Sequence, residues 1–316
     1  MISRRSWLGT TAAGLAGLAC ETGLAKSIPP PLTCGVAIGT YGLQSKPLPE
    51  ALQFISDTGF DATEITVFKG MTGEPSALGK KARKEIRKLL DGEKLRLTAL
   101  MAHVQPSKDD AKQAAATDEL KRDIELARDL NPVAPPLIQT VLGGGKDWDA
   151  AKEMFRDRLA NWMQICADQK VLFCVKPHRG SALSRPEHAV WLLEQLGESD
   201  WMRICYDYSH FAFREPSMTI AETVKTALPL TAYVAVKDTV QLDGGKTTFK
   251  LVGEGGNWDT SEIVKAFHKG GYRGDFCCEV SSAIWRGEPN YDAEAATKLC
   301  YENLTAAFEK AGVPRG

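Results

Sequence analysis

Side chains that carry charge or move protons recur at the ends of apolar runs in the second half of the chain. These residues are Lys176, His178, Asp207, His210, Lys237, Asp238 and Glu279. Carboxylates, imidazoles and ammonium groups gathered in one place can remove a proton, return it and stabilise a developing negative charge. Each residue taken alone fits a hydrogen-bonded structural role, but their joint occurrence on successive runs favours a ligand or proton-transfer site.

The runs belong to a regular alternation of strand and helix patterns. Short apolar segments predict strands at 34–39, 62–68, 95–103, 137–142, 171–177, 203–208, 232–237 and 276–280. Amphipathic segments predict helices at 49–58, 80–93, 117–130, 148–169, 185–196, 219–227, 261–269 and 292–311. Alternation of this kind favours parallel strands with crossover helices, and the length fits a single α/β domain, a (β/α)₈ TIM barrel. An open doubly wound sheet is the alternative, but no Gly-x-Gly-x-x-Gly follows the first predicted strand.

In such a barrel, polar residues at the carboxyl ends of strands form the active site. Side chains alternate along a strand, so Lys176 and His178 share a face, as do Ala235 and Lys237. We therefore expect one mouth of the barrel to gather His103, Lys176, His178, Asp207, His210, Lys237 and Glu279, with Asp207 and Glu279 close together.

The N-terminus carries the pattern of an export signal. Arg4 and Arg5, followed by Trp7 and Leu8, match the twin-arginine motif. The Ala- and Gly-rich residues 10–19 are too few to cross a bilayer core of about 30 Å. We therefore expect a periplasmic protein without stable insertion into the membrane.

The chain divides into three parts by composition. We predict a twin-arginine signal peptide over residues 1–26, a Pro-rich linker over 27–32 and the barrel over 33–316. Cleavage near residue 19 or 25 is expected, and lipid anchoring at Cys20 is a minor alternative.

The composition is that of a soluble globular protein, with 43% hydrophobic and 25% charged residues. A formal net charge of -1 indicates no nucleic-acid partner, since such partners favour a basic surface. Of the eight cysteines, Cys174, Cys205, Cys277 and Cys278 lie in apolar runs and are interpreted as core thiols. Oligomeric state is left open by the sequence.

The strand ends resemble those of the xylose-isomerase-like TIM-barrel superfamily, which includes sugar phosphate isomerases and epimerases and endonuclease IV. The resemblance covers residues 33–313. It rests on Asp207-Tyr208-Ser209-His210, Val236-Lys237-Asp238, Gly253-Glu254-Gly255 and Cys278-Glu279. The family holds a divalent metal with a Glu on strand five, an Asp on strand six, a His on strand seven and a Glu on strand eight.

Two of those four positions depart from the family pattern. Asp207 and Glu279 match, whereas Lys176 stands at the Glu position and Ala235 at the His position. An ammonium can balance two carboxylates but cannot offer the open coordination position of a metal. The resemblance therefore implies either no cofactor or a divalent Mn²⁺, Mg²⁺ or Zn²⁺ ion bound weakly by Asp207, His210 and Glu279.

The leading hypothesis is an enzyme that abstracts a proton next to the carbonyl of a sugar or keto-sugar, as an isomerase, epimerase or lyase. Glu279 or Asp207 is the expected base, His178 or His210 the second acid/base, and Lys176 and Lys237 the oxyanion stabilisers. Contacts to the small carbohydrate substrate are expected from His103, Arg179, Asp238, Glu254 and Trp285. A Schiff base at Lys176 is disfavoured because two flanking carboxylates oppose the lowered pKa that it needs.

Two other classes of protein remain as alternatives. A catalytically inactive, carbohydrate-binding barrel would also lose metal ligands, and Trp148, Trp258 and Trp285 could stack on a sugar or pack on the barrel. Turnover separates this class from the enzyme. An abasic-site endonuclease is opposed by the export signal, the near-zero charge and the lack of a histidine-rich three-metal set.

The export signal can be tested directly. Replacing Arg4 and Arg5 together by Lys should retain the protein in the cytoplasm, because the pathway reads the paired arginines. Cell fractionation and blotting measure the outcome, and unchanged export of the double variant would contradict the localisation.

Overall fold

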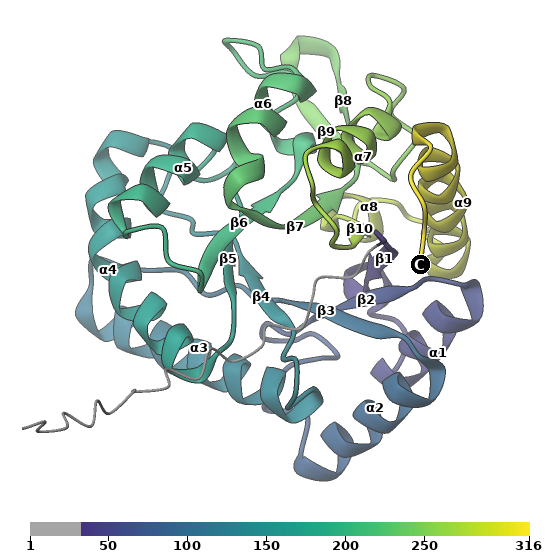
Figure 1. The fold of residues 1–316 in the computed structure, drawn as a ribbon, viewed down its shortest axis with the longest axis horizontal. Coiled ribbons are helices and arrows are strands. Elements are labelled where there is room, and N and C mark those ends of the chain that lie inside the picture. Colours follow the sequence, from purple (N-terminus) through teal and green to yellow (C-terminus); the bar gives the residue numbers. More distant parts are fainter. Residues whose placement is uncertain (1–32) are drawn as a thin grey trace, which may run out of the picture. The chain divides into compact units, whose positions relative to one another are not determined.

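The computed structural model describes residues 33–316. The predicted signal peptide and linker, including Arg4, Arg5 and Cys20, lie outside these residues. Eight parallel strands close into a barrel in the order β1-β10-β7-β6-β5-β4-β3-β2, with helices around it (Figure 1). The strands are β1 (Val36–Gly39), β2 (Ala62–Thr66), β3 (Arg96–Met101), β4 (Leu137–Thr140), β5 (Phe173–Val175), β6 (Met202–Tyr206), β7 (Thr231–Val236) and β10 (Phe276–Cys278). The predicted (β/α)₈ barrel is confirmed.

Helices follow the strands, and all but one short helix lie where the amphipathic pattern places them. They are α1 (Leu48–Thr58), α2 (Lys80–Glu93), α3 (Asp110–Leu130), α4 (Trp148–Gln169), α5 (Pro186–Gln195), α6 (Ile220–Ala227), α7 (Thr260–Lys269), the short α8 (Ser282–Trp285) and α9 (Ala293–Ala311). Helix α3 starts seven residues earlier than predicted, since Asp110 rather than residue 117 opens it. The Asp109 carboxylate accepts the Lys112 N–H at 2.9 Å, and this cap starts the helix ahead of its apolar stripe.

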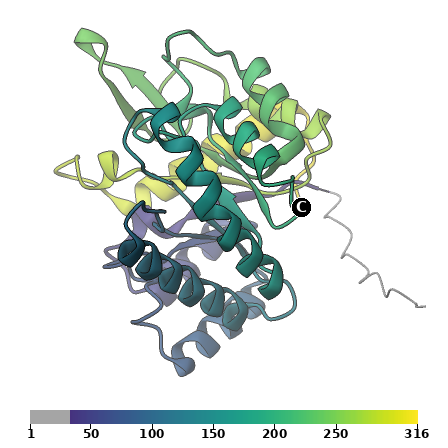
Figure 2. The ribbon, with the colours of Figure 1, turned by 90° about the vertical axis from the view of Figure 1, so that its left-hand side faces the viewer.

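A β-hairpin that the sequence patterns did not predict follows β7. Its strands β8 (Asp238–Gln241) and β9 (Thr247–Lys250) pair antiparallel outside the barrel, and in Figure 2 they stand out from it in green. Arg179 holds the hairpin in place by donating to Thr247 Oγ1 and to the Ala212 carbonyl. The hairpin therefore belongs to the same end of the barrel as the loop after β5.

Small side chains fill one layer of the barrel interior. This layer contains Ala37, Ala62, Ala99, Cys174, Cys205, Tyr233, Ala235 and Cys277. Because successive side chains point to opposite faces, residues two positions further along point inward as well. They form a second layer nearer the carboxyl ends: Gly39, Glu64, Met101, Gln139, Lys176, Asp207, Lys237 and Glu279. The barrel therefore places a polar layer directly above an apolar one.

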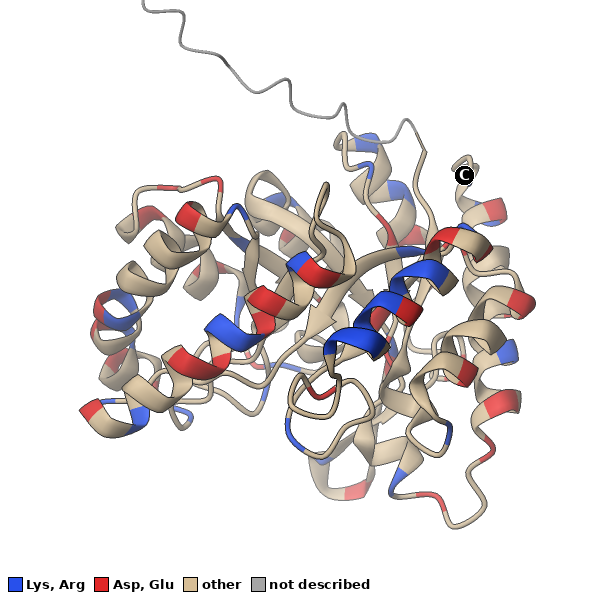
Figure 3. Cartoon of the chain, turned by 90° about the horizontal axis from the view of Figure 1, so that it is seen from below, with Lys and Arg blue, Asp and Glu red and all other residues tan. Residues whose placement is uncertain are grey.

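The seven cysteines in residues 33–316 are buried and unpaired. This confirms the interpretation of Cys174, Cys205, Cys277 and Cys278 as core thiols. No helix within the described part of the chain has the length and apolarity to cross a membrane. Acidic and basic residues are interspersed along the outer helices in the view of Figure 3.

Candidate active site

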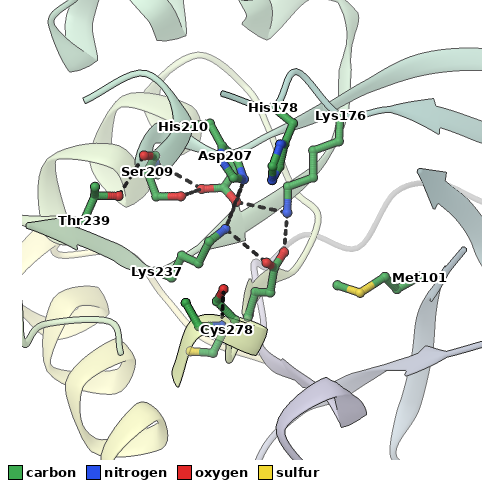
Figure 4. Close-up of polar contacts among 12 residues, drawn as sticks. Met101, Lys176, His178, Asp207, Ser209, His210, Lys237, Thr239 and Cys278 are labelled. Carbon is green, nitrogen blue, oxygen red and sulfur yellow. Dashed lines mark hydrogen bonds and ion pairs between the residues drawn. The ribbon is translucent and has the colours of Figure 1, made fainter. Parts of the chain in front are cut away.

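Four charged side chains meet at the mouth of the barrel, and we call Lys176, Asp207, Lys237 and Glu279 the ion cluster; the first three are buried and Glu279 is partly exposed. Lys176 Nζ lies 3.0 Å from Asp207 Oδ2 and also contacts Glu279 Oε2. Lys237 Nζ lies 2.5 Å from the same Asp207 oxygen and 3.1 Å from Glu279 Oε1. Each acid therefore contacts both ammonium groups, and the formal charges of the four side chains cancel (Figure 4).

Short-range structure orients Asp207 within the ion cluster. The residue follows β6 and caps the 3₁₀ turn Tyr208–His210. Its Oδ1 accepts the backbone N–H of Ser209 at 3.1 Å and the Ser209 hydroxyl at 2.5 Å. Oδ2 is thereby left to face the two lysines.

The two lysines have different capacities for a further ligand. The Lys237 ammonium has three N–H groups, and it faces Asp207, Glu279 and His210 Nε2, the last at 3.3 Å. Lys176 faces only the two acids among the described residues, so one of its donors is left. Lys176 is therefore the lysine equipped to donate to a bound molecule.

Mutual contact sets the protonation of these groups. Burial alone would raise the pKa values of Glu279 and Asp207, but the two ammonium groups outweigh burial and hold both pKa values below the ordinary range. Burial alone would lower the pKa of Lys176, but the carboxylates of Glu279 and Asp207 outweigh it and raise that pKa well above its ordinary value. Lys176 is therefore a cation and not an amine nucleophile.

Two neutral histidines flank the ion cluster. Burial and the neighbouring Lys237 and Lys176 lower the pKa of His178 to about 4 and hold that of His210 well below 6.5. The two rings lie with centroids 4.0 Å apart. His178 Nδ1 accepts the Gly180 N–H at 3.0 Å, so the neutral ring carries its proton on Nε2. His178 can therefore donate a hydrogen bond without being charged.

The strand register places a second lysine beside Glu279. Cys277 pairs with Ala235 and the Glu279 N–H donates to the Val236 carbonyl at 3.0 Å, so Lys237 lies level with Glu279. Ala235 lies one layer deeper, among the side chains of the interior. At the level of Glu279, strand β7 therefore presents an ammonium group and not a methyl group.

A pocket of about 230 Å³ opens beside the ion cluster. Its lining includes Tyr41, Phe68, Met101, His103, Gln139, Lys176, His178, Phe249, Glu279, Ser281 and Ser282. Asp207 and Lys237 lie behind these residues, because they are buried and do not line the pocket. Glu279 is thus the carboxylate of the ion cluster that a bound molecule can touch.

The expected substrate-binding residues separate into two groups. His103 lines the pocket, and Trp285 packs against the lining residue Tyr41, with ring centroids 5.5 Å apart. The other three hold loops and do not line the pocket: Arg179 fixes the hairpin, Asp238 accepts the Gly255 N–H at 2.7 Å, and the exposed Glu254 accepts the Leu251 N–H at 3.2 Å.

The other tryptophans named from the sequence pack on the protein. Trp148 stacks on His188 with ring centroids 4.4 Å apart and an interplanar angle of 3°. Trp258 meets Tyr208 edge to face at 5.1 Å. Neither lines the pocket.

Sequence reasoning missed a buried acid near the ion cluster. Glu64, on β2, accepts a hydrogen bond from Gln139 on β4 at 3.1 Å. Burial raises the pKa of Glu64 to about 7. Its signal in the sequence is a lone acid inside the apolar run 62–68. Phe249 was missed as well, because only the folded hairpin carries its ring over Lys237 at 4.9 Å.

The residues present do not fit the divalent metal that the resemblance implies. Two ammonium groups contact the same carboxylates that a metal would need, and Lys237 also faces His210 Nε2, the expected third ligand. No set of three or more His, Cys, Asp or Glu side chains within residues 33–316 is arranged to hold a metal ion. A cation would therefore have to displace both lysines.

The ion cluster should stabilise the fold only as a balanced set. Lys176→Met should lower the free energy of unfolding by about 3–5 kcal/mol, because it leaves the acids in excess. Lys176→Met combined with Glu279→Leu removes one charge of each sign and should lower the free energy of unfolding by less than Lys176→Met alone. Urea unfolding measures both, and Lys310→Met, which removes an exposed ion pair with Asp259, is the control. An equal loss of unfolding free energy in the single and the double variant would contradict the claim that the cluster stabilises the fold through its charge balance.

The same variants should differ in acid stability. Carboxylates with lowered pKa values contribute stability at neutral pH, and that stability is lost as the pH falls through the folded-state pKa values. In Lys176→Met at least one of these pKa values rises toward its unfolded-state value, so acidification should cost this variant less unfolding free energy than it costs the wild type, as urea unfolding at stepped pH measures.

A variant in which both lysines are replaced by metal-binding residues should bind a divalent metal ion. Lys176→Glu with Lys237→His supplies Glu, Asp, His and Glu at one level of the barrel, and it should bind Mn²⁺ or Zn²⁺ stoichiometrically in titration calorimetry. Lys176→Glu with Ala235→His is the matched control, because it keeps the Lys237 ammonium and should bind far more weakly. Metal that survives dialysis on the wild-type acids would refute this account.

Known proteins show the same barrel. Residues 52–303 match the model of the xylose isomerase-like TIM barrel family. No curated protein matches the sequence. L-ribulose 3-epimerase superposes with a TM-score of 0.69 at 18% identity, over 89% of this chain and 96% of its own.

Two further structures agree. The 3-keto-D-glucoside 4-epimerase from E. coli superposes with a TM-score of 0.65 at 13% identity, over 87% of this chain and 100% of its own. The IolI protein, solved with a zinc atom, gives a TM-score of 0.73 at 17% identity, over 88% of this chain and 99% of its own. The match of the family model over residues 52–303, on a closed eight-stranded barrel, shows that this chain belongs to the xylose isomerase-like TIM barrel family.

Proposed function

We propose that this protein is a sugar isomerase or epimerase, or a related lyase, that abstracts a proton next to a carbonyl without a metal. The observation that carries the proposal is the ion cluster, which places a carboxylate and a protonated lysine together at the wall of the pocket. The epimerases among the similar structures support the reaction class. We also propose that it acts in the periplasm, after export through the twin-arginine pathway.

Glu279 is the proposed base. It lines the pocket, whereas Asp207 is buried behind it, so Glu279 is the acid of the ion cluster that reaches a substrate C–H bond. Its lowered pKa makes it a weaker base than an isolated carboxylate. That handicap must be offset by stabilisation of the product of proton removal.

Lys176 and His178 are the proposed source of this stabilisation. Breaking the C–H bond next to a carbonyl puts the proton on Glu279 and moves the electron pair toward the carbonyl oxygen, giving an enediolate. Lys176 has a donor to spare, and the neutral His178 offers Nε2–H. Fixed donors at a developing oxyanion lower the barrier without reorganisation at the moment of reaction.

The fate of the enediolate decides the product. Return of the proton to the neighbouring carbon, with transfer of the hydroxyl proton from one enediolate oxygen to the other, gives an isomer. Return of the proton to the opposite face of the original carbon gives an epimer, and loss of a leaving group from the next carbon gives elimination. Glu279 can carry the carbon-bound proton on the first path, because a single carboxylate can move a proton between adjacent carbons on one face.

A non-catalytic carbohydrate-binding barrel is the second candidate. Each acid of the ion cluster is held by two ammonium groups, which favours a stable structural network over a reactive base. In that case the pocket would bind sugars and leave their C–H bonds intact. Hydrogen exchange distinguishes the two candidates.

Solvent exchange tests the catalytic proposal. Ketoses and keto-glucosides incubated with the enzyme in D₂O should gain deuterium next to the carbonyl, measured by NMR, and a chelator should leave the rate unchanged. Glu279→Gln should slow exchange by about 10²–10⁴-fold, the usual contribution of a general base. Glu125→Gln, on the outside of α3, is the control. Exchange that vanishes with the chelator would exclude a metal-free reaction.

The pH profile identifies the base. Because the Glu279 pKa is lowered, the exchange rate should stay undiminished as the pH is lowered to 4.5, the ordinary carboxyl pKa. An acidic limb near pH 7 would contradict the assignment of Glu279 as the base.

A further inference from the structure

Among residues 33–316, no Lys or Arg with an unbalanced charge lines the pocket beside the ion cluster. Lys176 is the single Lys or Arg of the described lining, and although one of its N–H donors is left, its charge is offset by the carboxylates of Asp207 and Glu279. His178 is neutral, because its Nδ1 accepts the Gly180 N–H at 3.0 Å and therefore carries no proton. A phosphate or carboxylate group is normally held by Arg, by Lys or by several convergent N–H groups. An anion here would instead meet the carboxylate of Glu279.

Three cationic residues lie close in the sequence to residues that line the pocket, but their side chains make contacts outside it. Arg179 is bound to Thr247 and to the Ala212 carbonyl, and it does not line the pocket. Arg286 lies over the Trp285 ring at 4.4 Å. Lys69, next to Phe68, lines a separate depression that also contains Glu74. The structure thus directs none of the three into the pocket.

The remaining lining is suited to an uncharged polyol. Tyr41, Phe68 and Phe249 provide aromatic faces against which the C–H groups of a sugar ring can pack. Ser281, Ser282 and Gln139 offer hydroxyl and amide groups that match sugar hydroxyls. A volume of about 230 Å³ is smaller than a typical drug-sized site, which favours one ring.

We propose that this pocket selects an unphosphorylated, uncharged monosaccharide unit, a keto-sugar or its glycoside, and discriminates against sugar phosphates and sugar acids. The inference rests on the proposed function and narrows its substrate class. The preference arises from two features: the described lining holds no Lys or Arg with an unbalanced charge, and it holds the carboxylate of Glu279.

Matched pairs of ligands test this preference. D-fructose with D-fructose 6-phosphate, and D-xylulose with D-xylulose 5-phosphate, are compared by titration calorimetry and by solvent exchange. We expect the free sugar of at least one pair to bind about tenfold or more tighter than its phosphate, the scale of one charged hydrogen bond. Phosphates that bind as well as or better than the free sugars in both pairs, or no preference in either pair, would overturn the proposal.

Three variants test the role of the charge in the lining. Ser282→Arg places a free cation in the lining and should shift the preference toward the phosphate by about tenfold. Met101→Lys does the same from β3 if the first variant fails to fold. Arg286→Ala should leave the preference unchanged, and loss of phosphate binding in that variant would show that Arg286 serves the pocket and would overturn the proposal.

The two proposals fail in different ways. Exchange on the phosphates alone would reject the uncharged substrate and keep the enzyme. Tighter binding of the free sugars without exchange on any of them would reject the enzyme and keep the selectivity of the pocket.

Discussion

Two lysines and two acids neutralise one another inside this barrel, and the chemistry of the site depends on that balance. A single buried charge costs several kcal/mol, so none of the four would be stable at the mouth alone. Each carboxylate contacts both ammonium groups, and the arrangement holds the acids ionised and Lys176 protonated. The same cations hold the nearby His178 and His210 neutral. One set of contacts therefore decides the protonation of the whole site.

The barrel makes this balance possible because it delivers one residue from each of four neighbouring strands to the same level. Strands β5, β6, β7 and β10 are adjacent in the closed sheet, and their inward side chains alternate with the same period. Alanine and cysteine fill the layer beneath. The polar layer then lies at the mouth, where one side of it meets the pocket and the other stays buried.

Replacing a metal by ammonium groups changes what the site can do. A metal can hold a substrate oxygen in an open coordination position, whereas an ammonium donates along its N–H bonds. Lys237 has no donor to spare and Lys176 has one, so the site can stabilise one developing oxyanion but cannot chelate two oxygens of a sugar. Among the described residues, the aromatic lining of the neighbouring pocket adds no Lys, Arg, Asp or Glu to those of the ion cluster, so the charges of the cluster stay balanced.

The strands, most helices and the polar strand ends could be predicted from the sequence by itself, because hydrophobic periodicity and residue type are local properties. The convergence of Lys176, Asp207, Lys237 and Glu279 also followed, once eight alternations implied a closed barrel. Only the tertiary structure decided that Lys237, and not Ala235, stands level with Glu279, since a shift of two residues along a strand is invisible without its neighbour. Only the tertiary structure showed that Glu64 bonds to Gln139 and that the Phe249 ring lies over Lys237. It also showed that Arg179, Asp238 and Glu254 bond to loops and do not line the pocket. These outcomes depend on contacts between segments far apart in the chain, which no local pattern specifies.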